Sequence, residues 1–408
     1  MRKVTGISAV ALVVAGAAIG GVSVAAAAAA HHGDPAASPY LAQIAKVSWP
    51  APYVTPAGFD ISYVDPGTQT YYLSDQSNAG VAAINAQTDA WGGEIGAGDF
   101  TGLNTGRHAV SPSQVKACGG PDAHGTGGPN GVVTFTVGGV RQLAAGNGIS
   151  QAHPHGNVKI FDLAFPDSGT LAATVVTGGV CRADSVAYDP ADHLLAATNG
   201  NDTPPFLSLI SVHANPAQDK VVRRISFPAA TGGIDAPVYD QGTHLFYVGL
   251  TGEGVGVIDP VTGSLSTTFP AAACAQSGIA LDPATQEILL ACGPGPGGSA
   301  VMSARTGKIL ARIPQVSGAD EAWFDPGSND FYLGAVGMTS TGTAAPFGYP
   351  SPVIGVISAG SPQQLPRWVA NIPTSTTGNP HSVAADPANR QVFVPIGGYG
   401  LAVFDWHG

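Results

Sequence analysis

A pattern of hydrophobic and polar positions recurs along the chain. An apolar, strand-like run ends at an Asp that is usually followed by Pro, and a second apolar run, such as Leu245–Val248 or Phe331–Leu333, begins about five residues later. Asp-Pro units favour tight turns, so each copy predicts a β-hairpin. The six turn residues are Asp65, Asp189, Asp240, Asp282, Asp325 and Asp386.

Each predicted hairpin belongs to a longer unit of four strands. After Asp240, a third run covers Val255–Asp259 and is followed by a turn at Val261–Gly263. After Asp282, a fourth run covers Ile309–Ile313. The turn Asp recurs every 42 to 61 residues from Asp189 on, which is typical of propeller blades with some insertions.

The long interval between Asp65 and Asp189 holds one more, degenerate unit. Its segment Leu143–Gly148 parallels Leu195–Gly200. The count becomes seven, and the predicted fold is an all-β, seven-bladed propeller. A pair of stacked sandwiches is the alternative, but a sandwich has no reason to repeat a four-strand unit.

The chain ends predict how the ring closes. The sequence stops after the third strand of the last unit, whereas Ile44–Pro50 resembles fourth strands such as Arg224–Pro228. We therefore expect the N-terminal strand to complete the last blade, which leaves no unpaired edge in that blade.

Two groups of repeat segments carry a further signal: Leu245–Val248 with Val255–Gly263, and Leu194–Asn199 with Val221–Ile225. They resemble the repeats of the YncE-like proteins with YVTN repeats, a bacterial, often exported family of seven-bladed propellers. The similarity covers most of residues 40 to 407 and departs in the second blade and in long insertions. The resemblance implies the fold, but the family's repeat is a structural motif and provides no catalytic residue to carry over.

Composition agrees with this fold and excludes several classes of protein. Hydrophobic residues make up 44% of the chain and charged residues only 11%, which excludes a charged coiled coil or a disordered polar tail. Only four of the 27 acidic residues are Glu, a helix former, whereas Asp favours turns. The formal net charge is -11 and there is no run of Lys or Arg, so nucleic acid is not an expected partner.

The N-terminus predicts export. Arg2 and Lys3 precede an uncharged stretch from Val4 to Ala30, an order typical of a secretory signal peptide. We therefore expect a leader at 1–30 and a single propeller domain at 31–408, located outside the cell, in the periplasm or at the cell envelope. An uncleaved anchor is the alternative; its richness in Ala and Gly makes the stretch only weakly hydrophobic. After cleavage no membrane contact is expected.

Four cysteines in an exported chain permit two disulfides. Cys181 lies three residues before Asp184, and Cys118 lies in a long insertion nearby. Cys274 and Cys292 flank the inner hairpin of one unit. The expected bridges are Cys118–Cys181 and Cys274–Cys292.

The insertions gather on the propeller face opposite the Asp-Pro turns, which we call the decorated face. Such loops on a rigid scaffold are a common place for binding or chemistry. The position five residues before each turn Asp begins an inner strand near the channel mouth on this face. The residues at this position are Asp60, Asp184, Asp235, Ser277, Asp320 and His381.

This column has two interpretations. Each Asp can cap backbone N–H groups of its own loop, or several carboxylates and one imidazole can converge to bind a cation or a polar ligand. His153, His155, His108 and His124 are predicted on the same face, and imidazole favours transition metals. The predicted metal set is His153, His155, His381, Asp184 and Asp235, with isolated surface histidines as the alternative.

No catalytic motif accompanies the column. The chain has no G-x-S-x-G elbow, no H-E-x-x-H, no P-loop and no C-x-x-C-H, so neither a nucleotide nor covalent haem is expected. The first functional hypothesis is an exported binding module that holds a small ligand, glycan, protein or metal at the channel mouth. The alternative is a metal-assisted hydrolase of lactonase or esterase type, in which a divalent cation polarises a carbonyl or activates water. Whether the protein is an enzyme is left open.

Overall fold

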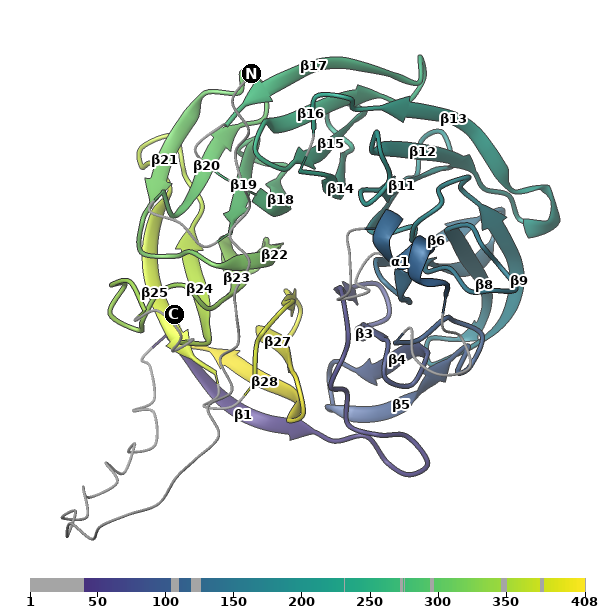
Figure 1. Ribbon diagram of the computed structural model, residues 1–408. Helices are drawn as coiled ribbons and strands as arrows, with labels where there is room; N and C mark the ends of the chain where they lie inside the picture. Colours follow the sequence, from purple (N-terminus) through teal and green to yellow (C-terminus); the bar gives the residue numbers. More distant parts are fainter. Residues whose placement is uncertain are drawn as a thin grey trace, which may run out of the picture. The chain divides into compact units, whose positions relative to one another are not determined.

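The computed structural model describes residues 40–103, 110–118, 126–230, 232–271, 274, 276–293, 297–345, 351–374 and 378–407, with the side chains of 276 and 277 excepted. Seven four-stranded antiparallel sheets follow one another around a ring (Figure 1), which confirms the predicted seven-bladed propeller. The degenerate unit between Asp65 and Asp189 forms a complete blade.

The blades are numbered in chain order, and strands are given from the channel outward. Blade 1 comprises β2 (Ser62–Asp65), β3 (Thr70–Asp75), β4 (Gly80–Asn85) and β5 (Ala90–Ile95). Blade 2 comprises β6 (Val132–Val137), β7 (Val140–Asn147), β8 (Asn157–Phe165) and β9 (Ser168–Val176). Blade 3 comprises β10 (Val186–Asp189), β11 (Leu194–Asn199), β12 (Phe206–Ser211) and β13 (Lys220–Ser226). Blade 4 comprises β14 (Ile234–Asp240), β15 (Leu245–Leu250), β16 (Gly254–Asp259) and β17 (Ser264–Pro270). Blade 5 comprises β18 (Gln276–Asp282), β19 (Glu287–Cys292), β20 (Ser299–Ser303) and β21 (Ile309–Ile313). Blade 6 comprises β22 (Ala319–Asp325), β23 (Asp330–Ala335), β24 (Val353–Ser358) and β25 (Arg367–Pro373). Blade 7 comprises β26 (Ala384–Asp386), β27 (Gln391–Ile396), β28 (Gly400–Trp406) and β1 (Leu41–Val47).

The repeated Asp forms the inner hairpin of its blade by a local hydrogen bond. Asp189 accepts a bond of 2.8 Å from the N–H of Ala191, and Asp240 accepts one of 2.9 Å from Gly242. The same bond, to the N–H two residues later, occurs at the other four turn residues. The residue four positions after each Asp, such as His193 with a φ of 54°, has a left-handed backbone conformation. The recurring Asp therefore has a structural role on this face.

The N-terminal strand closes the ring. β1 pairs antiparallel with β28 from Leu41↔Trp406 to Val47↔Leu401, which confirms the predicted closure. The strand lies three residues earlier than the segment that the sequence indicated, and it ends before Pro50, which has no N–H to donate to a ladder.

The core lies between neighbouring sheets, which pack face to face. Between blades 4 and 5, for example, Tyr247 and Val257 pack with Leu290 and Met302. At the closure, Tyr71 of blade 1 packs on Phe393 of blade 7, with ring centroids 5.1 Å apart. Each blade thus depends on both neighbours for its buried surface. No helix in the described ranges is long and apolar enough to cross a membrane.

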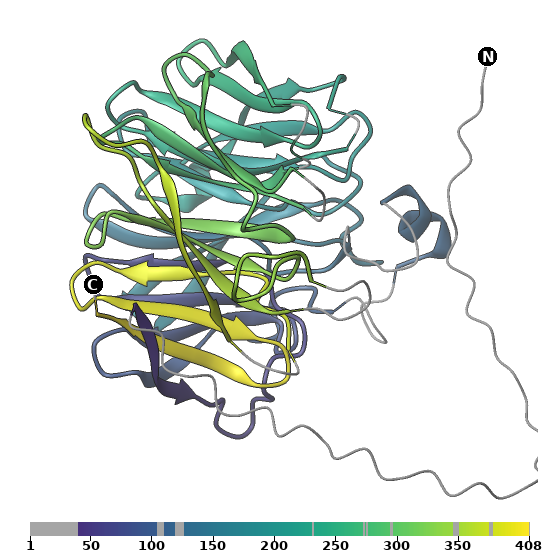
Figure 2. The same ribbon diagram turned by 90° about the vertical axis from the view of Figure 1, so that its left-hand side faces the viewer.

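Both predicted disulfides, Cys118–Cys181 and Cys274–Cys292, are present. Cys118 follows the short helix α1 (Pro112–Ala117), whose first turn is capped by Ser111. Figure 2 shows α1 standing on one face of the ring. The 3-10 helix η3 (Pro216–Gln218) precedes β13.

Removing the Cys118–Cys181 bridge should destabilise the protein more than removing Cys274–Cys292. The two bridges span 63 and 18 residues, and a cross-link over a longer loop restricts the unfolded chain more. We expect the double Cys→Ser variants to lose about 2–4 kcal/mol of unfolding free energy, with the longer loop costing about 1 kcal/mol more. Urea denaturation of both variants measures this difference, and an equal or reversed order would contradict it.

Candidate functional site

Most of the predicted column assembles at the mouth of the central channel. Asp60 and His381 lie just before β2 and β26, and Asp184 lies just before β10. Asp235 and Asp320 are the second residues of β14 and β22. Hydrogen bonds and ion pairs link four of them across blades. The side chain of Ser277 is outside the described residues.

Arg182 connects the first two carboxylates. Its Nη1 lies 3.0 Å from Oδ2 of Asp60, and its Nη2 lies 2.6 Å from Oδ2 of Asp184. Both carboxylates are buried, with 5% and 4% of the residue exposed, so their charges need a partner. Burial alone would lower the pKa of the Arg182 guanidinium, but the negative charges of Asp184 and Asp60 outweigh burial and raise this pKa.

His381 extends this network to a fourth residue. Its Nε2 lies 3.0 Å from Oδ1 of Asp60, and its Nδ1 lies 3.2 Å from Oδ2 of Asp320. Burial alone would lower the pKa of His381, but the charge of Asp320 and the hydrogen bond to Asp60 raise it to about 9. His381 is therefore an imidazolium at neutral pH, and the chain of contacts runs Asp184–Arg182–Asp60–His381–Asp320.

Asp235, Asp320 and Glu321 form a second group, which we call the acidic trio. One carboxylate oxygen from each lies within 4.8 Å of the other two. Asp235 accepts hydrogen bonds from the Ser185 hydroxyl and, at 2.8 Å, from the Ala236 N–H. The side chain of Asp320 is 41% exposed, so solvent reaches the trio.

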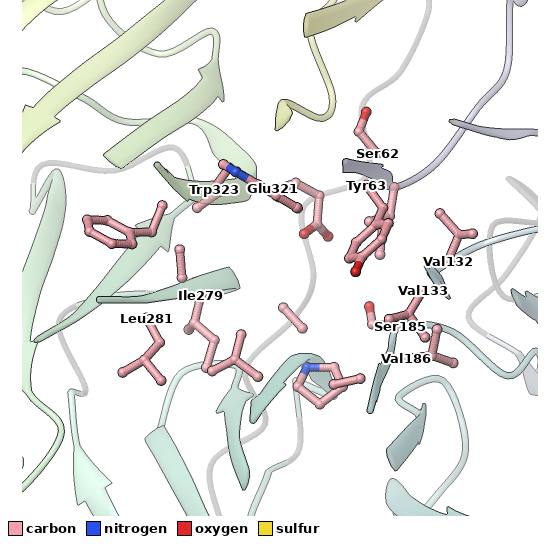
Figure 3. Close-up of a pocket in the computed structure, with 18 of the residues that line it drawn as sticks. Ser62, Tyr63, Val132, Val133, Ser185, Val186, Ile279, Leu281, Glu321 and Trp323 are labelled. Carbon is pink, nitrogen blue, oxygen red and sulfur yellow. The ribbon is translucent and has the colours of Figure 1, made fainter. Parts of the chain in front are cut away.

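Glu321 differs from the other carboxylates of the mouth. The residue is only 6% exposed, and within the described ranges its carboxylate has no hydrogen-bond or ion-pair partner. In Figure 3 its oxygens point into the open centre of the channel. Burial, together with the charges of Asp235 and Asp320, raises the pKa of Glu321 well above its usual range. Burial also raises the pKa of Asp235 to about 6, with Asp320 acting in the same direction.

The charges of the mouth do not balance. Five carboxylates, those of Asp60, Asp184, Asp235, Asp320 and Glu321, face the two cations Arg182 and His381. The cations contact Asp60, Asp184 and Asp320, so the carboxylates of the mouth without a cation beside them are Asp235 and Glu321 of the trio. This part of the mouth must take up protons or bind a cation.

A β-bulge explains why Asp320 and Glu321 both reach the mouth. The pairing of β22 with β23 is irregular between Ala319 and Ala322, so the strict alternation of side chains is interrupted there. A similar irregularity lies between Asp235 and Val238 in β14, where Ala236 has a φ of 42°. The trio therefore sits on two bulged strands from different blades.

The capping interpretation of the column fits Asp235, which accepts the N–H of Ala236. Elsewhere in the described parts of the chain, Asp184 and Asp320 pair with the side chains of Arg182 and His381. The contact between Asp320 and His381 crosses between two blades, whereas Asp184 pairs with Arg182 within its own loop, and Arg182 in turn reaches Asp60 of another blade.

The predicted metal set is placed differently from the trio. Nδ1 of His155 lies 3.1 Å from the carbonyl oxygen of Gly179, and both His153 and His155 are exposed. The one group of at least three potential ligands within the described ranges contains Asp235, but not His153, His155, His381 or Asp184. A metal held by that predicted set stays a prediction. His108 and His124 lie outside the described residues.

The mouth opens into a cavity of about 370 Å³ in the central channel (Figure 3). Its walls come from the innermost strands and are largely apolar, with Val132, Val186, Ile279 and Leu281 among the lining residues. Trp323 also lines the cavity, and its ring meets that of Tyr63 edge-on at a centroid distance of 5.8 Å. Trp323 therefore lines the channel and also packs between blades.

Two residues of the mouth carried only weak signals in the sequence. Arg182 is one of only 16 Lys and Arg residues and lies two positions before Asp184. The signal for its role was therefore a rare cationic side chain in the loop that leads to an inner strand. Glu321 is one of four Glu residues and follows Asp320 directly. Neither position repeats between units, so a comparison of the repeats does not reveal them.

Comparisons with known proteins support the architecture. No family model matches this sequence, and no curated protein is found to match it. Among solved structures, the chain is similar to a chain in the crystal structure of the mitotic checkpoint complex, with a TM-score of 0.61 and 12% sequence identity over 96% of this chain and 99% of that chain. At this identity the similarity shows the fold alone, a seven-bladed β-propeller.

Proposed function

We propose that this protein is a binding module that holds a cationic ligand at the acidic trio. The observation that carries the proposal is the buried Glu321 carboxylate, which faces the channel without a partner in the described structure while Asp235 and Asp320 lie beside it. Such a group is costly to bury unless it is protonated or paired. A bound cation would pair with it.

The ring preorganises this site. Asp235 and Glu321 belong to different blades. The Ser185 hydroxyl holds the carboxylate of Asp235, and His381 holds that of Asp320. Ligands on separate rigid strands need little ordering when a cation binds. This supports a site built for binding at the channel mouth.

We also propose that the protein is exported and belongs to the YncE-like propellers. The repeat segments around Leu245–Val248 and Val255–Gly263 support the family, and the two disulfides support an oxidising compartment. The segment 1–30 would be the leader. Mass spectrometry of the protein secreted by an expressing bacterium tests this, because the leader would be missing from the mature chain.

A pH-dependent titration tests the binding proposal. A cation competes with protons for Asp235, whose pKa burial raises to about 6, and for Glu321, whose pKa burial raises well above its usual range. Affinity for calcium or ethylammonium, used as probes, should therefore rise between about pH 5 and about pH 7.5, by up to tenfold per pH unit for each proton released. Calorimetry in buffers of different ionisation enthalpy measures both affinity and proton release.

The double variant Asp235→Asn/Glu321→Gln should abolish this binding and keep the fold. Asp192→Asn is the matched control, because it removes an exposed carboxylate on the opposite face. If neither probe binds the wild type, or if the double variant binds as the wild type does, the proposal is wrong.

A metal-assisted hydrolase is a second candidate function. It is favoured by the three oxygen ligands within 4.8 Å of one another, because carboxylate oxygens suit calcium or magnesium. A divalent cation held by Asp235, Asp320 and Glu321 would supply Lewis-acid chemistry. Hydrolysis of a lactone and ester panel that is lost with a chelator and in Glu321→Gln would support it, whereas hydrolysis unaffected by both would contradict it.

A further inference from the structure

The cavity below the trio gives the candidate site a second, apolar half. Glu321 and Ser185 line its end at the mouth, and Tyr188, Tyr239 and Phe324 line it nearer the Asp-Pro turns. Its volume of about 370 Å³ falls within the range of small-molecule sites. A ligand bound at the trio therefore has room to extend into the channel.

The chemistry changes along the channel from acidic to apolar. Beyond the mouth, the lining consists mainly of Val, Ile, Leu and aromatic side chains, including Val186 of blade 3 and Ile279 of blade 5. A hydrated metal ion would gain nothing from these walls, whereas hydrocarbon transferred from water into them would be stabilised. The cavity thus favours a ligand that carries both a cation and an apolar body.

The trio also matches the geometry of an ammonium group. A primary ammonium has three N–H donors and no acceptor, and the trio presents three carboxylates whose oxygens lie within 4.8 Å of one another. Hydrogen bonds between ions are stronger than neutral ones. One ammonium could bond to Asp235, Asp320 and Glu321 together.

We propose that the ligand is an organic amine whose ammonium group is held by the acidic trio and whose apolar body lies in the channel against Tyr63 and Trp323. This inference rests on the proposed function and narrows it to one chemical class. Tyr63 and Trp323 meet edge-on and line the cavity next to Glu321, so they form a rigid aromatic wall beside the ammonium.

A series of alkylammonium ions tests the inference by calorimetry. Affinity should rise from methylammonium to n-hexylammonium by about threefold to fourfold for each methylene that enters the channel. Glu321→Gln should weaken the whole series. Val186→Phe, which narrows the cavity, should remove the gain with chain length, and Asp192→Asn should leave the series as in the wild type.

The outcomes separate the inference from the proposed function. If calcium and methylammonium bind but the longer amines bind no better, the site holds a small cation and the amine inference is wrong. If n-hexanol binds as tightly as n-hexylammonium, the channel is an apolar pocket without a role for the charge, which also overturns the inference. If no cation binds, the proposed function fails as well. If Val186→Phe does not fold, the series of alkylammonium ions with the wild type still tests the inference, because affinity must rise with chain length.

Discussion

Deleting residues 40–50 should cost more than about 5 kcal/mol of unfolding free energy. These residues include β1, which supplies the outer strand of blade 7 although blade 7 is otherwise formed by the C-terminal end of the chain. Leu41, Val47 and Trp49 are 1%, 5% and 7% exposed, so the deletion removes three core side chains. It also leaves the edge of β28 unpaired, which promotes association between chains.

Urea denaturation and light scattering measure the two consequences of this deletion. Ile44→Ser is the matched control, because Ile44 lies on the same strand with 52% of its surface exposed and should change stability by less than about 0.5 kcal/mol. A truncated chain with the stability of the full chain would contradict ring closure by β1.

Replacing Arg182 with Met should cost about 3–5 kcal/mol, because it leaves two buried carboxylates without their cation. Asp60 and Asp184 lie 3.0 Å and 2.6 Å from the guanidinium in the structure. The loss should appear as the pH rises above the unfolded-state pKa values of these acids and should shrink at acid pH, where the carboxylates take up protons. Chemical denaturation at several pH values measures it.

Two further variants isolate the cause of the Arg182→Met effect. Arg305→Met removes an exposed cation and should change stability little. The triple variant Arg182→Met/Asp60→Asn/Asp184→Asn removes the uncompensated charges and should recover part of the loss. If Arg182→Met alone is as stable as the wild type, the ion-pair network does not hold the mouth together.

The fold could be predicted because its determinants are local and repeated. The turn residues, such as Asp240, accept a hydrogen bond from the N–H group two positions later, so a similar short sequence encodes the same hairpin in six of the seven blades. The closure could be predicted because Ile44–Pro50 has the pattern of a fourth strand; its bounds shifted because the pattern does not specify register. The two disulfides could be predicted because Cys181 and Cys274 each lie three residues before a position of the column, and Cys118 and Cys292 were expected near them on the same face.

The candidate site could be predicted only in part because its contacts cross blades. Aligning the repeats located Asp60, Asp184, Asp235, Asp320 and His381. It could not reveal that Arg182 reaches Asp60, 122 residues away in the sequence, or that His381 reaches the same side chain from the last blade. A bulge brings Glu321 to the mouth, and bulges break the alternation on which strand predictions depend.

Diffraction from crystals soaked in 4-bromobenzylamine tests the central claim most directly, because anomalous scattering locates the bromine without bias. We predict a bromine peak in the channel against the wall formed by Tyr63 and Trp323, with the amine nitrogen about 3 Å from carboxylate oxygens of Asp235, Asp320 or Glu321. Bromine found only outside the channel, with the trio making no contact to an amine, would contradict the claim. The mouth would then be a structural network, and binding would have to be sought on the outer loops.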